Sequence, residues 1–164
     1  MSRIFILLFF FQISFGQEKS IQEYKRIAYE IINNTDYSVF ATVENNLADS
    51  RTMDHFKLES DFTLYFGTTI YSRKVKQIQN NPYVTVHFNS KENDGYVSIK
   101  GYARVSNDLA LKEKYWKDDW DKFYPTKSNY RVIKVKINTF ELISEKHNIV
   151  GDSLTWKSPV IEIN

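Results

Sequence analysis

The sequence predicts a mainly β domain, a six-stranded antiparallel β-barrel that is closed or nearly closed and carries flanking helices. Three observations lead to this prediction. Of the 164 residues, 42% are hydrophobic and 16% are aromatic, and aromatic side chains favour pleated strands. Six short runs of strand-forming residues follow one another, separated by residues that tolerate turns. The chain also has enough apolar material for one core without disulfide or metal cross-links.

The N-terminal stretch has the layout of a secretory signal peptide. Arg3 precedes a short apolar run, and the small residues Ser14 and Gly16 stand at the −3 and −1 positions of a cleavage site. The run is too short for a transmembrane helix, which needs about 20 apolar residues. A buried first strand or helix is the alternative. We therefore expect a signal peptide over 1–16 and a mature domain over 17–164 that is secreted or periplasmic, without stable membrane insertion after cleavage.

An amphipathic helix is expected at the start of the mature domain. Ser20 can cap its first turn, and Asn33 and Asn34 end it. Between these positions, apolar residues recur at the 3.6-residue spacing of one helix face. They are Ile21, Tyr24, Ile27, Ala28, Ile31 and Ile32.

The strands are expected where β-branched and aromatic residues gather between turn-forming residues such as Asn93–Gly95. The short separations favour antiparallel neighbours in a small barrel. Two further helices are expected between strands, from about Arg73 to Asn80 and from about Leu109 to Phe123. The six expected strands are Tyr37–Val43, Thr52–Leu58, Phe62–Phe66, Tyr83–Phe88, Tyr96–Val105 and Tyr130–Leu142.

Charge and residue inventory exclude several classes of function. A total of 22 Lys and Arg against 20 Asp and Glu gives a net charge of +2, too small an excess to indicate a nucleic-acid partner. The absence of cysteine excludes a thiolate nucleophile and a Cys-ligated metal. His55, His87 and His147 lack ligand-spaced partners, so we expect no metal site. The order of residues that a serine hydrolase needs is absent as well.

Several hydrogen-bond donors gather in the stretch that follows the third expected strand. Ser72 is suited to cap the next helix, whose N-terminus exposes N–H groups at the positive end of the helix dipole. Arg73 and Lys74 add charge, and Thr68 and Thr69 add hydroxyl groups. A dianionic phosphate would find charge-assisted hydrogen bonds there. A polar helix start with two solvated charges is the alternative, and composition alone does not decide between the two.

The same stretch resembles the signature segment of pyridoxamine 5′-phosphate oxidase-like flavoproteins. Ser72–Pro82 matches the pattern S-R-K-x-x-Q-I-x-N-N-P that links two strands in that family. Upstream, Phe40–Val43 followed by Arg51–Met53 is similar to A-T-V…R-x-[VM]. Downstream, Val97–Val105 is similar to V-x-G-x-A-x-V. Trp120–Pro125 resembles the short, general-stress-protein branch of the family.

This resemblance implies a split β-barrel that binds flavin mononucleotide (FMN), normally as a homodimer with two cofactors at the interface. By position, Arg51, Ser72, Arg73 and Lys74 would hold the phosphate. The redox chemistry would belong to the flavin, which the protein positions, so the implied function is that of an FMN-binding oxidoreductase for an unidentified small molecule. Four further residues would lie along the ribityl chain and the ring, partly through backbone groups: Thr52, Met53, Thr68 and Thr69.

The chain departs from the full oxidase at three places. Phe56 stands where the oxidase carries a lysine for its substrate's phosphate, Glu145–Trp156 contains no R-x-H element, and no glutamine precedes the strand at Gly95 and Tyr96. These departures argue against vitamin B6 oxidation. An exported chain must also acquire its flavin outside the cytoplasm. Another phosphorylated ligand, haem or an empty pocket are therefore the alternatives to FMN, and a non-catalytic binding protein of the cell envelope is the alternative to an enzyme.

Tryptophans in the last expected helix have two interpretations. Trp116 and Trp120 recur with Leu111 and Tyr115 at helical spacing, which is typical of a packing face. The alternative is contact with a flavin ring or with a second subunit.

Overall fold

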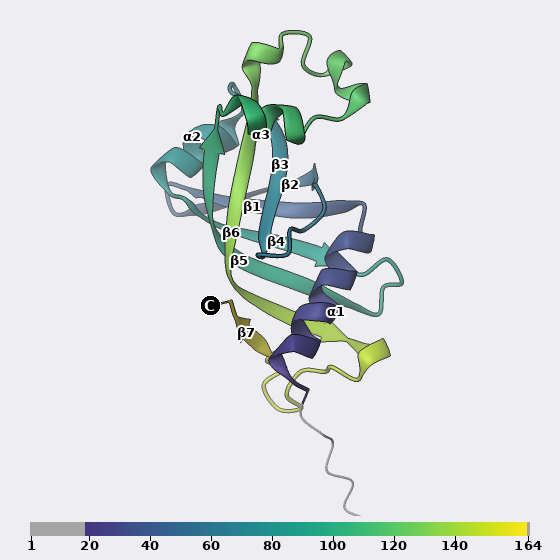
Figure 1. The fold of residues 1–164 in the computed structure, drawn as a ribbon. Helices are drawn as coiled ribbons and strands as arrows, with labels where there is room; N and C mark the ends of the chain where they lie inside the picture. The colour runs from purple at the N-terminus through teal and green to yellow at the C-terminus, as the bar shows by residue number, and fades with distance from the viewer. Residues whose placement is uncertain (1–18, 164) are drawn as a thin grey trace, which may run out of the picture.

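The computed structural model describes residues 19–163, so the expected signal peptide over 1–16 lies outside the described residues. The strands, in chain order, are β1 (Tyr37–Glu44), β2 (Leu47–Asp54), β3 (Thr63–Thr69), β4 (Tyr83–Asn89), β5 (Gly95–Ser106), β6 (Tyr130–Ser144) and β7 (Val160–Glu162). They pair antiparallel in the order β2-β1-β4-β5-β6-β3, and β7 pairs with β6. The sheet curls into an open barrel (Figure 1). The predicted six-stranded antiparallel fold is confirmed, and the short β7 is an addition.

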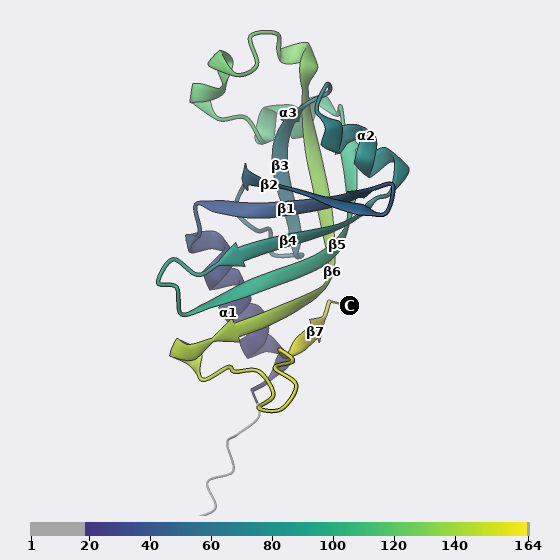
Figure 2. The same cartoon turned by 180° about the vertical axis from the view of Figure 1, so that it is seen from behind.

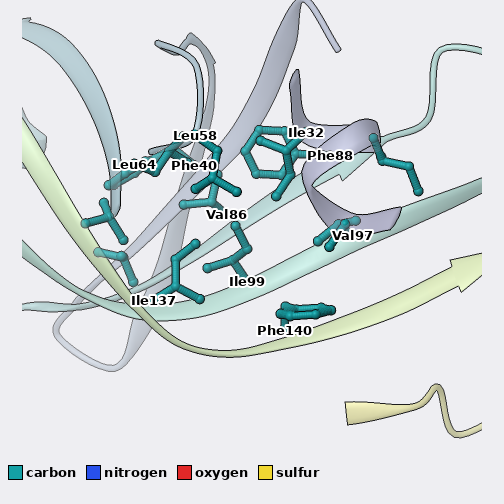
Figure 3. Close-up of a cluster of buried hydrophobic side chains, with 14 of the residues drawn as sticks. Ile32, Phe40, Leu58, Leu64, Val86, Phe88, Val97, Ile99, Ile137 and Phe140 are labelled. Carbon is teal, nitrogen blue, oxygen red and sulfur yellow. The ribbon is translucent and has the colours of Figure 1, made fainter. Parts of the chain in front are cut away.

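Apolar side chains from most of the strands fill the interior of the barrel. Figure 3 shows Phe40, Val86, Ile99 and Ile137 among the side chains that meet there. The rings of Phe40 and Phe66 meet edge to face, with centroids 5.0 Å apart. Every second residue of a strand points to the same face, so the outward neighbours of these residues stay polar or half-exposed.

The first helix is confirmed as α1 (Ile21–Asn34), and the Oγ of Ser20 accepts the backbone N–H of Glu23 at 3.2 Å. Its apolar face, which includes Ile27 and Ile31, packs on the core. α1 lies across one face of β4 and β5 (Figure 1), and the view from behind shows no described helix over the opposite face of these strands (Figure 2). Within residues 19–163, no helix is long and apolar enough to cross a membrane.

The second strand was predicted over Thr52–Leu58, and that prediction is wrong in its bounds, because β2 already begins at Leu47. Asn45 and Asn46 have φ values of 51° and 63°, which is the left-handed pair that a two-residue hairpin turn requires. This turn places β2 directly beside β1, and pairing then imposes strand geometry on polar residues of low strand propensity.

The helix Arg73–Asn80 is confirmed as α2, whereas the helix predicted over 109–123 is too long. Instead, α3 (Leu109–Lys114) is followed by the short 3₁₀ turns η1 (Asp118–Lys122) and η2 (Lys127–Asn129), and a further turn, η3 (Glu145–His147), follows β6. α3 ends because the carbonyl group of Tyr115 accepts the hydroxyl of Tyr130, outside the helix. The ring of Tyr115 also stacks on Tyr65, with centroids 4.0 Å apart.

The residues after α3 form a second cluster, which we call the aromatic lobe, on the outer side of β3 and β6. Trp120 is 8% exposed and packs against Phe56, Tyr124 and Tyr130 at centroid distances of 5.5, 5.5 and 5.6 Å. The predicted packing role of Trp120 is therefore confirmed. The lobe consists of Phe56, Tyr65, Leu111, Tyr115, Trp116, Trp120, Tyr124, Tyr130 and Val132.

His55 joins the end of α1 to the barrel. Its Nε2 lies 3.1 Å from the carbonyl oxygen of Ile32 and therefore donates to it, and its ring meets Phe88 edge to face. The Nδ1 atom is buried and has no hydrogen-bond partner among the described residues. Burial lowers the pKa of His55, because the imidazolium ion would lose its hydration there.

We expect the protein to lose stability as the pH falls below about 6.5, the usual pKa of histidine. Since the pKa of His55 is lowered on folding, the unfolded chain binds more protons in the interval between the two pKa values. The free energy of unfolding then falls by up to about 1.4 kcal/mol per pH unit in that interval and is constant above it. Urea unfolding between about pH 5 and pH 8 measures this slope. The slope should disappear in His55→Gln and persist in the control His87→Gln, and a slope unchanged in His55→Gln would contradict the assignment.

Candidate anion-binding site

A polar cluster lies at the end of the barrel beside α2. In the register of β1 and β2, Arg51 lies opposite Phe40 and Asp49 lies opposite Thr42. Opposed residues of an antiparallel pair point to the same face, so Arg51 and Asp49 both point inward with these two buried neighbours. Gln77 of α2 is 1% exposed, and its Oε1 accepts the hydroxyl of Thr42 at 2.6 Å. The hairpin and α2 together therefore build the cluster.

Arg51 is held by four acceptors. Its Nη1 donates to Thr42 Oγ1 at 2.8 Å and to the carbonyl oxygen of Phe40 at 3.3 Å. Its Nη2 lies 3.0 Å from both Gln77 Oε1 and Asp49 Oδ2. The side chain is 19% exposed, so the guanidinium group is fixed in orientation while the side chain is not fully buried.

Asp49 accepts a hydrogen bond from Gln77 and forms ion pairs with Arg51 and Arg73. Its Oδ2 lies 2.9 Å from Gln77 Nε2, 3.0 Å from Arg51 Nη2 and 3.4 Å from Arg73 Nη2. The hydrogen bond from Gln77 and the charges of the two arginines hold the pKa of Asp49 below its usual value. The amide nitrogen of Gln77 also donates to Glu44 Oε2 at 3.1 Å. Asp49 is therefore an anion that already lies on both arginines.

Lys74 approaches the same place from the first turn of α2. Its Nζ donates to Ser72 Oγ at 2.7 Å and to Thr68 Oγ1 at 3.3 Å. Burial lowers the pKa of Lys74, and the positive charges of Arg51 and Arg73 lower it further. Two of the three ammonium donors are used, and the third is free for a ligand.

Ser72 occupies the N-cap position of α2, as expected, but its side chain makes no capping hydrogen bond. The expectation of a capping side chain is wrong, because the Ser72 hydroxyl is instead the acceptor for Lys74. Arg73 follows at the first helical position, and its side chain is 79% exposed. The helix start therefore presents one half-buried cation, Lys74, and one exposed cation, Arg73.

Of the eight residues expected around a cofactor, the structure brings five together and leaves three apart. Thr69 is half-buried, and its carbonyl group accepts the N–H of Ser72. The side chain of Met53 lies in the barrel core, and Thr52 is exposed on the outer face of β2, so side chains at these two positions do not enter the cluster. The five that gather are Arg51, Thr68, Ser72, Arg73 and Lys74.

Sequence reasoning missed Thr42, Asp49 and Gln77, the residues that hold Arg51 in place. A signal for Asp49 was present, since it lies two residues before Arg51 and would share its face on a correctly placed strand. Gln77 stands within the S-R-K-x-x-Q segment, but its position there does not reveal that its amide is buried.

The cluster is suited to an anion that has several oxygen atoms. Three cations and two hydroxyl groups supply charge-assisted donors. They outnumber the two negative charges of the cluster, the carboxylates of Asp49 and Glu44. In the described part of the chain, no group of three His, Asp or Glu side chains is arranged to hold a metal ion. The donor set therefore fits a phosphate group, and it offers no comparable environment for a cation.

Comparison with known proteins identifies the family. Residues 23–155 match the model of the family described as pyridoxamine 5′-phosphate oxidase like. The general stress protein 26 of Bacillus subtilis is 25% identical over 119 residues, which is 71% of this chain and 84% of that protein.

Solved structures agree with this match. The general stress protein 26 of Bacillus anthracis is 32% identical, with a TM-score of 0.65 over 74% of this chain and 94% of that one. A protein related to general stress protein 26 from Clostridium acetobutylicum is 16% identical, with a TM-score of 0.70 over 87% of this chain and 96% of that one. The latter likeness shows the fold, and the former also supports the general stress protein 26 branch.

Proposed function

Because the chain belongs to the pyridoxamine 5′-phosphate oxidase-like family, we propose that it binds FMN and acts as an FMN-dependent oxidoreductase on a small molecule. The observation that carries the proposal is the convergence of Arg51, Arg73 and Lys74 with the hydroxyls of Thr68 and Ser72. When bound, FMN supplies the electron-transfer chemistry. The chain supplies the means of holding and orienting it.

Each residue has a distinct task in this proposal. Arg51 is preorganised by its partners and offers a fixed guanidinium edge to the phosphate. Lys74 adds a half-buried ammonium group, and the neighbouring hydroxyls of Thr68 and Ser72 can turn from Lys74 to the phosphate oxygens. Arg73 closes over the anion from the solvent side. The remainder of the cofactor would lie along Thr52, Met53, Thr68 and Thr69, partly through their backbone groups.

Lys74→Met should weaken FMN binding by about 10- to 50-fold, because this corresponds to about 1.4–2.3 kcal/mol, the lower part of the range for a hydrogen bond to a charged group. Riboflavin has no phosphate and should bind equally well to both forms. The matched control is Lys76→Met, which removes the same charge from an exposed position on the same helix. Fluorescence titration with both flavins is the measurement. Equal losses for FMN and riboflavin, or equal effects of the two substitutions, would contradict the phosphate assignment.

Vitamin B6 phosphates are not the substrates that we propose. Phe56, at the position of the oxidase's lysine, packs against Tyr115 and Trp120 at centroid distances of 5.0 and 5.5 Å. An aromatic ring supplies no charge for a second phosphate.

The same observation favours a second candidate function, a non-catalytic cofactor- or ligand-binding protein of the cell envelope. Bound flavin that no electron donor reduces would support this second candidate. The envelope location itself rests on the sequence of residues 1–16.

We further propose a homodimer that uses the outer face of β1, β4 and β5. This face carries the exposed side chains of Tyr37, Val39, Val43 and Tyr83, and a groove of about 480 Å³ lies on it. No described helix covers it (Figure 2). Large permanent interfaces bury roughly 2,000 Å² or more. Light scattering at micromolar concentration should give a dimer mass for the wild type and a monomer mass for Val39→Glu. A monomeric wild type with FMN bound would refute the dimer.

A further inference from the structure

Asp49 occupies the place on the arginines that the proposed function assigns to phosphate. Its Oδ2 is within 3.0 Å of Arg51 Nη2 and 3.4 Å of Arg73 Nη2, and its side chain is 24% exposed. Gln77 donates to the same oxygen at 2.9 Å. One carboxylate oxygen therefore accepts a hydrogen bond from Gln77 and forms ion pairs with both arginines, as a phosphate oxygen would.

The positive charges of the cluster explain why the carboxylate of Asp49 lies between the arginines. Arg51 and Arg73 both lie within 3.4 Å of Asp49 Oδ2, and the charges of the two arginines help to lower the pKa of Lys74. Like charges at such distances repel one another, more strongly where water is partly excluded. Without an anion among them, the ligand-free protein would carry this repulsion unrelieved. Asp49 is ionised at neutral pH, since its pKa is lowered, and it offsets one of the three charges.

We propose that Asp49 is an internal counter-anion, which stabilises Arg51 and Arg73 in the ligand-free protein and gives up Arg73 when a ligand's phosphate binds. This inference rests on the proposed function. Arg73 is the partner that Asp49 gives up because its contact is the longest of the three and its side chain is 79% exposed. Arg51 stays in place because Thr42 and Gln77 also hold it.

Two consequences follow for the ligand. With Asp49 in place, the charge of the cluster is partly offset before any flavin binds, which would suit a chain that acquires its cofactor after export. Phosphate also binds less tightly than the three cations alone would allow, because it meets the negative charge of Asp49. The ligand class that this site selects is therefore a terminal phosphate with enough charge to displace a carboxylate.

Asp49→Asn tests the proposal, because asparagine has the same size and can still accept the N–H of Arg51 but carries no charge. We expect FMN to bind about 3- to 10-fold more tightly, since a unit charge about 6 Å from a doubly charged phosphate has an effect of this order in a water-like dielectric with salt. Riboflavin binding should not change. The melting temperature of the ligand-free protein should fall by about 2–4 °C.

Glu44→Gln is the matched control, because Glu44 also accepts from Gln77 but contacts neither arginine. It removes the same charge and should change FMN affinity less than Asp49→Asn does. Weaker FMN binding by Asp49→Asn would overturn the proposal and make Asp49 a positioning residue for Arg51. Unchanged affinity would overturn it as well. If the wild type itself binds FMN and riboflavin equally well, the proposed function fails and this inference fails with it. If the wild type prefers FMN but Asp49→Asn does not increase that preference, the inference alone is overturned.

Discussion

Replacing Arg51 by Met should weaken FMN binding by about 100-fold, the largest effect that we expect for one side chain of the site. Arg51 is the more buried of the two arginines, since 19% of its side chain is exposed compared with 79% for Arg73. Its orientation is fixed by Thr42 and Gln77 before any ligand binds, so little entropy is lost on binding. A factor of 100 corresponds to about 2.7 kcal/mol, within the range for a hydrogen bond to a charged group.

The same substitution should also lower the free energy of unfolding by about 1–3 kcal/mol, because it leaves polar partners of Arg51 without their donor. Denaturation separates this loss from the loss of affinity, and riboflavin binding reports whether the pocket is intact. Arg104→Met is the control, since Arg104 is exposed on β5. If Arg51→Met bound FMN as tightly as Arg104→Met does, Arg51 would have no part in holding the phosphate.

Gly67→Val should lower the free energy of unfolding by about 3 kcal/mol, at the upper end for overpacking of a core. A Cβ atom at Gly67 would lie 2.2 Å from Cζ3 of Trp120 and 2.9 Å from Cε2 of Tyr130. Neither ring can withdraw easily, because both are packed inside the aromatic lobe. Since Thr68 follows directly in β3, a displaced strand should also weaken FMN binding. Urea unfolding measures the first effect.

A double-mutant cycle shows whether the Trp120 ring is the cause. Gly67→Ala and Trp120→Leu should each destabilise the protein, and the double variant should lose at least about 1 kcal/mol less than the sum of the two, because the leucine leaves room for the new methyl group. Additive losses would mean that the backbone at Gly67, and not the neighbouring ring, sets the requirement for glycine.

The parts of the fold that local patterns determine were predictable from the sequence. Helix α1 has a cap and a regular apolar face, and helix α2 has turn residues on both sides. By contrast, β2 contains the polar stretch Asp49–Arg51, which forms a strand only because the Asn45-Asn46 turn pairs it with β1. α3 ends where tertiary contacts of Tyr115 replace the helix. Tertiary pairing overrode local propensity in both places.

The candidate site divides in the same way. Arg73 and Lys74 were recognisable from a local segment, and Arg51 from its resemblance to a family motif. Asp49 and Thr42 take part only through the cross-strand register, and Gln77 only through the packing of α2 on β1. Such partners are far apart in the sequence, and no local spacing reveals them. Thr52 shows the converse, because the strand's alternation turns its side chain to the outer face, whereas Met53 shares the inward face of Arg51 but lies in the barrel core.

An equilibrium titration of the purified wild-type protein with FMN and with riboflavin tests most directly whether the cluster around Arg51 holds the phosphate of FMN. The two ligands differ in the phosphate alone. We predict that FMN binds at least about 100-fold more tightly than riboflavin, and that this preference shrinks as salt screens the charges. Equal affinities for the two flavins, or no binding of FMN, would mean that the cluster around Arg51 does not hold the phosphate of FMN.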